Sequence, residues 1–221
     1  MHILLKKDGI EYGPLDQDTL AGAIECVSEV FTDAEPMSRF LGITKEEFLV
    51  FANAVYPHIA AQGLSFVARD SKTGKIVGIR ISEDFAGSEV DEIPGLSPKF
   101  FPLFTILGQI DNHFRNIRDD IVPGKYVHLF MVAVKSEYAG RGIAPNMNKL
   151  FFAHVKKLGF THAVTEPTGA ISQHILVNKF GFNIIHEIKY KDFVFEGEKV
   201  FAELQGHEGV MLLEKDLSEM P

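Results

Sequence analysis

Residues 127–158 read VHLFMVAVKSEYAGRGIAPNMNKLFFAHVKKL and contain three successive elements. Residues 127–134 are almost wholly apolar, which is typical of a strand buried on both faces. Residues 139–142 include two glycines, and from Ile143 onward apolar residues recur at helical spacing. The stretch therefore predicts a strand, a tight turn and a helix in direct succession.

The turn at Gly140-Arg141-Gly142 has the properties of a phosphate-binding site. Glycine adopts backbone conformations that other residues avoid and lets a ligand approach closely. The first amides of the following helix lack partners within the helix, and the helix dipole points its positive end at the turn. Neither a P-loop nor a dinucleotide-binding turn fits: Ile143-Ala144 stands where the first needs Lys-Ser/Thr, and Pro145 where the second needs glycine.

This region resembles the GNAT superfamily of acyl-CoA-dependent N-acyltransferases. Residues 139–144, AGRGIA, resemble the Q/R-x-x-G-x-G/A loop of that family, and residues 179–182, KFGF, resemble the K-x-G-F that closes its next helix. The resemblance is specific from Val127 to Phe182. It implies an α/β fold with a mixed, mostly antiparallel central sheet, flanking helices and splayed central strands, in a single domain over residues 1–221.

The resemblance also implies that acetyl-CoA binds along the strand and the turn. Backbone groups of Val132 and Val134 would pair with the pantetheine arm, and amides from Gly140 to Ala144 would hold the pyrophosphate. Ala139 stands where the family has Gln or Arg, which removes a side chain but keeps an amide, and Pro145 has no amide to offer. The implied cofactor-binding residues are Val132, Ala133, Val134, Ala139, Gly140, Arg141, Gly142, Ile143, Ala144 and Asn178.

Residues 31–37, FTDAEPM, resemble a short Phe and Glu-Pro-Leu signature of the arylalkylamine N-acetyltransferase branch of this family. The glutamate of that branch acts as general base, usually through water, and the resemblance gives this role to Glu35. A base is needed because only a neutral amine attacks a thioester. Pro36 is expected to end the preceding helix and to hold Glu35 extended. Met37 replaces leucine, and a solvated turn residue is the other interpretation of Glu35.

The sequence offers three candidates for the group that protonates the leaving sulfur. Many GNAT enzymes have a tyrosine late in the helix that begins near Ser172, but Val177 stands at that position. The arylalkylamine branch instead has hydroxyl residues four apart, and Thr168 with Ser172 matches that spacing. Either hydroxyl could pass a proton to the sulfur or simply cap the helix, and Tyr190 is a further candidate.

Two segments bear on the acceptor. Residues 97–118 form an amphipathic pattern rich in phenylalanine, expected to be slightly interrupted at Pro102 and Gly108, and the matching segment of the branch helps to wall the acceptor pocket. Residues 83–94 are acidic, and either a solvated loop or an acidic rim that attracts cationic amines would explain them. Their carboxylates belong to Glu83, Asp84, Glu89, Asp91 and Glu92.

In the rest of the chain, the periodicity predicts three further helices and six further strands. Helices are expected over residues 16–31, 44–61 and 172–180. Strands are expected over residues 3–5, 64–69, 75–82, 161–165, 182–188 and 210–213. Gly9, Gly13 and Pro14 are expected to break the chain after the first strand.

The composition of the chain limits which partners the protein can bind and in which compartment it is expected. The chain has 221 residues, a net charge of −8 and a single cysteine. The charge argues against nonspecific nucleic-acid binding, and no apolar run approaches the roughly 20 residues of a membrane span. Cys26 excludes an internal disulfide and suits a cytoplasmic protein. The histidine spacings indicate no metal site, and the protein is expected to be a monomer or a homodimer.

The sequence therefore predicts an acetyl-CoA-dependent N-acetyltransferase. It would move an acetyl group directly to the primary amine of a small arylalkylamine or polyamine-like substrate. Two alternatives remain open: a non-catalytic acyl-CoA-binding sensor, which Ala139 and the missing tyrosine allow, and a protein or peptide N-acetyltransferase.

Overall fold

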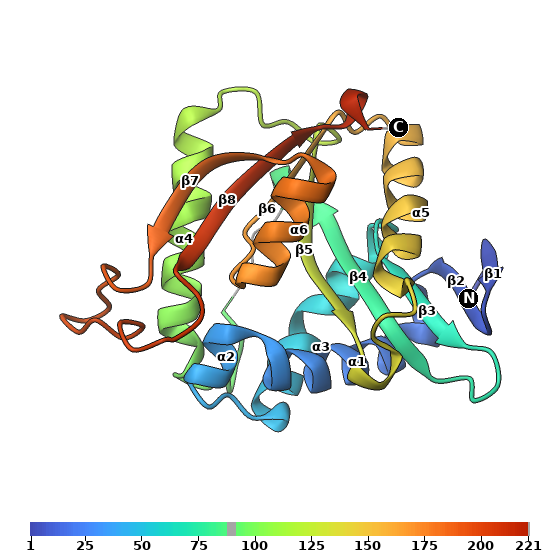
Figure 1. Ribbon diagram of the computed structural model, residues 1–221, viewed down its shortest axis with the longest axis horizontal. Coiled ribbons are helices and arrows are strands. Elements are labelled where there is room, and N and C mark those ends of the chain that lie inside the picture. The colour runs from blue at the N-terminus through green and yellow to red at the C-terminus, as the bar shows by residue number, and fades with distance from the viewer. Residues whose placement is uncertain (88–91, 221) are drawn as a thin grey trace.

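The computed structural model describes residues 1–87 and 92–220, and in these residues eight strands form one sheet (Figure 1). The strands are β1 (Leu5–Lys7), β2 (Ile10–Pro14), β3 (Phe66–Asp70), β4 (Ile76–Asp84), β5 (Tyr126–Val134), β6 (His162–Thr165), β7 (Asn183–Lys189) and β8 (Gly209–Asp216). The α-helices of the described residues are α1 (Gln17–Ala34), α2 (Pro36–Phe40), α3 (Lys45–Ala61), α4 (Phe100–Ile117), α5 (Ile143–Lys157) and α6 (Ala170–Phe180).

The strand order is β1-β2-β3-β4-β5-β6-β8-β7, and each neighbouring pair is antiparallel except β5 with β6. Figure 1 shows β1, β2 and β3 toward one end of the sheet and β7 and β8 toward the other, with β4 and β5 between them. A mixed, mostly antiparallel sheet with flanking helices was the predicted fold, and it is confirmed.

Alternation along the strands separates two apolar layers, as the two-residue period of a strand requires. Val127 and Leu129 of β5 pack with α5 on one face. Tyr126 belongs to the larger cluster that contains buried residues of α1, α3 and α4, and Ala133 joins it because β5 has an extra residue opposite Ile81–Glu83 of β4, which shifts the alternation. The sheet is therefore covered by helices on both faces, and β5 lies at its centre.

The start of the chain differs from the prediction, because a second strand, β2, runs through Gly13 and ends at Pro14. β1 pairs only with residues 10–12 of β2, so Pro14 lies where the strand has no neighbour on that side and its missing N–H is not needed. Gly13 is required for a close approach, since a Cβ there would lie 2.1 Å from the backbone oxygen of His2.

Helix α4 is continuous through Pro102 and Gly108, where an interruption was expected. Pro102 occupies the first turn, in which backbone amides have no partner within the helix. The helix over 44–61 begins as predicted, because Thr44 accepts from the Glu47 amide at 3.2 Å and Glu47 accepts from the Thr44 amide at 2.8 Å.

Candidate active site

The central sheet opens into a notch between β5 and β6. The two strands pair only from Tyr126 to His128, opposite His162 to Val164. β5 remains paired with β4 as far as Val134, so its second half has no strand on the β6 side in the part of the chain that the structure describes. This half of β5 offers an open backbone edge.

The direction of one hydrogen bond shows which residues face the notch. The Lys135 amide donates to the Val77 carbonyl across β4 at 3.0 Å. Backbone groups alternate sides along an antiparallel strand, so those of Ala133 also point to β4, and those of Val132 and Val134 point into the notch. The structure thus brings Val132 and Val134 to the open edge but turns the backbone of Ala133 away from it.

The open edge leads into the glycine turn and helix α5. Gly140 and Gly142 have φ of 74° and 70°, in the left-handed region that favours glycine, and Gly142 caps the helix without a side chain. In the described residues, the amides of Gly140, Arg141 and Gly142 have no protein acceptor, and Ile143 and Ala144 form the first turn of the helix. The turn therefore presents a set of free amides beside the notch.

Two residues at this turn, Ala139 and Arg141, are occupied by other contacts. The Ala139 amide donates to the Ser136 carbonyl at 3.0 Å, so it is not free for a ligand. The Arg141 guanidinium donates to the Asp8 carbonyl at 2.9 Å and lies 5.0 Å from the centre of the Tyr138 ring. Of the predicted cofactor-binding residues, the turn consequently offers backbone rather than side chains.

Glu35 lies at the corner between α1 and α2. Helix α1 ends at Ala34, and Pro36 occupies the first position of α2, a short helix that the sequence did not predict. The Glu35 carboxylate caps this helix by accepting from the amides of Met37 at 3.1 Å and Ser38 at 2.6 Å. Its orientation is therefore fixed by backbone donors, which a solvated turn residue would lack.

Thr168 meets Glu35 from the loop that follows β6. Its hydroxyl donates to the Glu35 carboxylate at 2.7 Å, and the buried Tyr190 hydroxyl donates to the Thr168 carbonyl at 2.7 Å. Burial, with a further contribution from the Glu35 charge, raises the pKa of Tyr190 above its ordinary value. Ser172 instead donates to the Gly169 carbonyl at 2.8 Å.

Asn178 lies on the exposed side of α6, where its amide is 3.0 Å from His174 Nδ1. The structure thus brings Glu35, Thr168 and Tyr190 together, whereas Ser172 contacts its own helix start and Asn178 pairs along α6. The contact between Glu35 and Thr168, which lie 133 positions apart in the sequence, was not predicted and is a consequence of the fold.

A cavity of about 690 Å³ lies between the sheet and helices α3 and α4. Phe51 of α3, Phe104 of α4 and Phe130 of β5 form aromatic walls. The residues around it are Phe51, Val55, Glu83, Glu92, Ile93, Pro94, Gly95, Leu96, Phe101, Phe104, Leu107, Gly108, Asp111, His128, Phe130 and Glu166. The segment 97–118 thus contributes to its wall.

One side of this cavity carries a carboxylate–imidazole–carboxylate cluster. His128 Nδ1 lies 3.0 Å from Glu83 Oε1, and His128 Nε2 lies 2.6 Å from Glu166 Oε2. Burial alone would lower the pKa of His128, but Glu166 and Glu83 overcome that effect and raise it to about 10. The imidazole is therefore charged at neutral pH, between two buried carboxylates.

Sequence reasoning missed this cluster. Its one local signal is His128, a polar residue within the apolar run 127–134. The acidic segment 83–94 is not simply a solvated loop, because Glu83 belongs to β4 and both Glu83 and Glu92 line the cavity. Glu89 and Asp91, two of the five acidic residues of that segment, lie outside the described residues.

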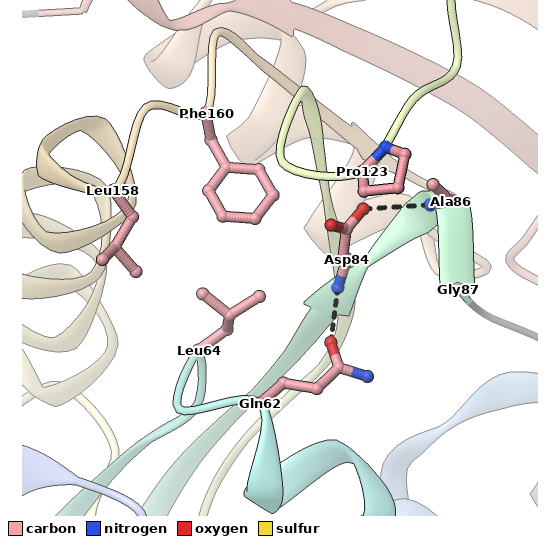
Figure 2. A pocket seen from close by; sticks show the side chains of 8 residues that line it. All are labelled: Gln62, Leu64, Asp84, Ala86, Gly87, Pro123, Leu158 and Phe160. Atoms are coloured by element: carbon pink, nitrogen blue, oxygen red, sulfur yellow. Dashed lines mark hydrogen bonds between the residues drawn. The ribbon is translucent and has the colours of Figure 1, made fainter.

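A second hollow, of about 370 Å³, lies elsewhere on the molecule (Figure 2). Figure 2 shows Leu64, Leu158 and Phe160 on one side of it and Asp84 opposite. The Asp84 carboxylate accepts from the amides of Ala86 at 3.1 Å and Gly124 at 2.6 Å. Its charge is thus used to fix the local backbone, and the notch with its adjoining cavity remains the better candidate site.

The cysteine, membrane-spanning helices and metal sites were the other features considered from the sequence. Cys26 is buried, and burial raises the pKa of its thiol to about 12, so it is an inert core residue. In residues 1–87 and 92–220, no helix combines the length and apolar character needed to cross a membrane, and no group of three His, Cys, Asp or Glu side chains could hold a metal ion.

No protein-family model matches the chain. The chain is similar in structure to the C-terminal condensation domain of Ebony in complex with β-alanyl-dopamine, with a TM-score of 0.82 and 17% identity, over 94% of this chain and 98% of that one. It is also similar to arylalkylamine N-acetyltransferase 2 from Aedes aegypti, with a TM-score of 0.76 and 19% identity, over 95% and 100% of the two chains.

A third similar structure is the polyamine N-acetyltransferase of Drosophila melanogaster, with a TM-score of 0.71 and 18% identity, over 94% of this chain and 99% of that one. The likeness extends over nearly the whole of each chain. The protein therefore has the GNAT fold, in the form found in arylalkylamine and polyamine N-acetyltransferases.

Proposed function

We propose that the protein is an acetyl-CoA-dependent N-acetyltransferase that acts on the primary amine of a small molecule. The observation that carries this proposal is the open edge of β5, which leads directly into the free amides of residues 140–144. A thioester carrier with an amide-containing arm and a pyrophosphate needs an open strand edge for the arm, followed by free amides for the pyrophosphate.

The residues of the notch fit acetyl-CoA. The backbone of Val132 and Val134 would pair with the amides of the pantetheine arm, in the manner of an added strand. The amides from Gly140 to Ala144, at the positive end of the α5 dipole, would hold the pyrophosphate. When bound, acetyl-CoA supplies an acetyl group that is already activated as a thioester.

Glu35 is suited to receive a proton from the acceptor amine, directly or through water. The amides of Met37 and Ser38 and the hydroxyl of Thr168 fix its carboxylate, which removes the need to orient it during the reaction. The neutral amine would then attack the acetyl carbonyl, the C–S bond would break, and the departing thiolate would take up the proton lost by the attacking nitrogen. No covalent acetyl-enzyme is needed, and the buried Cys26 is unsuited to form one.

The aromatic-walled cavity supports a small acceptor over a protein or peptide. Its volume of about 690 Å³ is within the range of sites that bind small molecules. Its carboxylates suit a cationic amine, and the similar structures named above include arylalkylamine and polyamine N-acetyltransferases. We therefore place the acceptor in this cavity, with its reacting amine toward Glu35.

The test is to incubate the protein with acetyl-CoA and a panel of arylalkylamines, monoamines and diamines. Thiol release and the mass of each amine product are both measured. The proposal predicts thiol release that depends on the amine, with a product heavier by one acetyl group. Binding of acetyl-CoA without any amine-dependent product would contradict it and favour an acyl-CoA sensor.

A further inference from the structure

Glu166 has a buried carboxylate oxygen without a partner in the described part of the chain. Its side chain is 11% exposed and lines the cavity. Oε2 contacts His128 at 2.6 Å, whereas the buried Oε1 has no hydrogen-bond partner. Leaving a buried carboxylate oxygen unpaired is costly, and such an atom needs a donor from water or a ligand.

The charges around the cavity do not cancel. Glu83 and Glu166 share a single basic partner, His128, so acidic side chains outnumber basic ones in this cluster. Asp111, also in the cavity lining, pairs with Arg115 at 2.9 Å, and Glu92 adds a further carboxylate. The cavity therefore favours a ligand that is both positively charged and a hydrogen-bond donor.

The position of Glu166 in the chain connects this acidic cluster with the residues of the proposed reaction. Glu166 is two residues before Thr168, whose hydroxyl contacts Glu35. Two residues span at most about 7 Å of backbone, so Glu166 belongs to the same short segment as the partner of Glu35. Apolar and aromatic side chains, including Phe51, Phe104 and Phe130, form much of the cavity wall.

We propose that Glu166 binds a second cationic group of the acceptor, an ammonium or guanidinium joined by an apolar spacer to the amine that is acetylated. This inference rests on the proposed function. His128 and Glu83 act as positioning residues, because Glu83 contacts His128, and His128 contacts Oε2 of Glu166 and leaves Oε1 without a protein donor. Glu166 is thus a specificity residue, whereas Glu35 serves the reacting amine.

The first experiment compares matched acceptors on the unmodified protein. The value of kcat/KM is measured for 1-aminohexane and 1,6-diaminohexane, and for shorter and longer pairs of the same kind. A diamine preference of about tenfold or more is expected at the best spacer length, since the second ammonium gains a charged hydrogen bond. The preference should arise mainly from KM.

The second experiment repeats this comparison on Glu166→Gln. The variant should lose about tenfold in kcat/KM for the diamine and less than threefold for the monoamine. Glu203→Gln, an exposed change that removes the same charge away from the cavity lining, should leave both values unchanged. Thermal unfolding of each variant tests whether it is folded. The ratio of kcat/KM for the diamine to that for the monoamine is measured on the unmodified protein, so this first test does not require any variant to fold.

The outcomes separate the two proposals. Acetylation of monoamines and diamines with equal kcat/KM would overturn the second cationic subsite and leave the proposed function intact. A diamine preference that persists in Glu166→Gln would overturn the role of Glu166, with a water as the donor to Oε1. Failure to acetylate any amine would overturn the proposed function itself.

Discussion

The notch at β5 and the cavity beneath α4 are built in opposite ways. The notch uses backbone groups from one continuous stretch, residues 129–144, and its exposed side chains are occupied elsewhere or absent. The cavity uses side chains from α3, β4, α4, β5 and the loop after β6. The notch should therefore be sensitive to backbone conformation, and the cavity to the charge and size of its side chains.

The largest effect is expected at Glu35, the proposed base, which lies outside the residues that line the cavity. Replacing Glu35 by Gln removes the proposed base and should lower kcat by about 10²–10⁴-fold. Acetyl-CoA binding, which uses the notch, should be unchanged. Steady-state kinetics and calorimetric titration with acetyl-CoA measure the two quantities.

The exposed Asp33→Asn variant serves as a control, because it removes a carboxylate from the same turn without touching α2. Its kcat should stay within twofold of the unmodified value. A Glu35→Gln variant with unchanged kcat at every pH would show that Glu35 is not the base.

The local pattern of the sequence was enough to predict the strand, the glycine turn and the helix that border the notch. The apolar run, the two glycines and the helical spacing after Ile143 all lie within 32 residues, and each reports on backbone conformation. The mixed sheet followed from the resemblance these residues carry. The sequence could not predict which backbone amides of the turn are free and which are already bonded. The Ala139 amide, for example, donates to the Ser136 carbonyl.

The cavity could not be predicted in the same way, because its residues are brought together only by tertiary packing. Glu83, His128 and Glu166 are 38 or more positions apart in the sequence, and each alone fits an ordinary loop or strand. The short helix α2 was also missed, since Pro36 both ends one helix and begins the next. Residues 97–118 were the exception, because their phenylalanine stripe marks a buried face.

The second largest effect concerns the cavity and its charge. The pKa of His128 is raised from 6.5 to about 10 in the folded protein, so its charged form stabilises the fold fully below about pH 6.5. That contribution is lost as pH rises toward 10. The free energy of unfolding should therefore fall by roughly 1–3 kcal/mol more in the unmodified protein than in His128→Gln between pH 7 and pH 10.

Urea unfolding at pH 7, 8.5 and 10 measures this difference. Lysine and tyrosine titrations are common to both proteins, so they cancel when the two curves are subtracted. Parallel curves over this range would mean that His128 is not held in its charged form by Glu83 and Glu166.

A third prediction concerns the backbone character of the notch. Gly142→Val forces a β-branched residue into the left-handed region, at a cost of roughly 1–2 kcal/mol. The site has room for a side chain, since the nearest atom to an added Cβ is Asn146 Nδ2 at 3.9 Å. Affinity for acetyl-CoA should fall about tenfold as the turn changes conformation.

Arg141→Ala is the matched comparison, because it removes a large charged side chain from the same turn but keeps the amide. Its affinity for acetyl-CoA should change by less than about threefold, as the guanidinium is engaged with Asp8 and Tyr138. A larger loss in Arg141→Ala than in Gly142→Val, measured by calorimetry, would reverse the assignment of backbone and side-chain roles.

The smallest effect distinguishes the two hydroxyl residues. Thr168→Val keeps the shape of the side chain but removes the donor to Glu35, and it should lower kcat by about fivefold to tenfold. Ser172→Ala removes only a bond to the Gly169 carbonyl and should change kcat by less than threefold. The opposite order of effects would make Ser172 the hydroxyl that takes part in proton transfer.

The central claim is that the notch binds acetyl-CoA, and thermal unfolding with and without acetyl-CoA tests it most directly. Ligand at 100 times its dissociation constant should stabilise the protein by about 2.7 kcal/mol, which raises Tm by roughly 5–10 °C for a chain of this size. The rise should be smaller in Gly142→Val at the same concentration. No rise with any acyl-CoA, in a protein shown to be folded, would contradict the cofactor assignment and the function built on it.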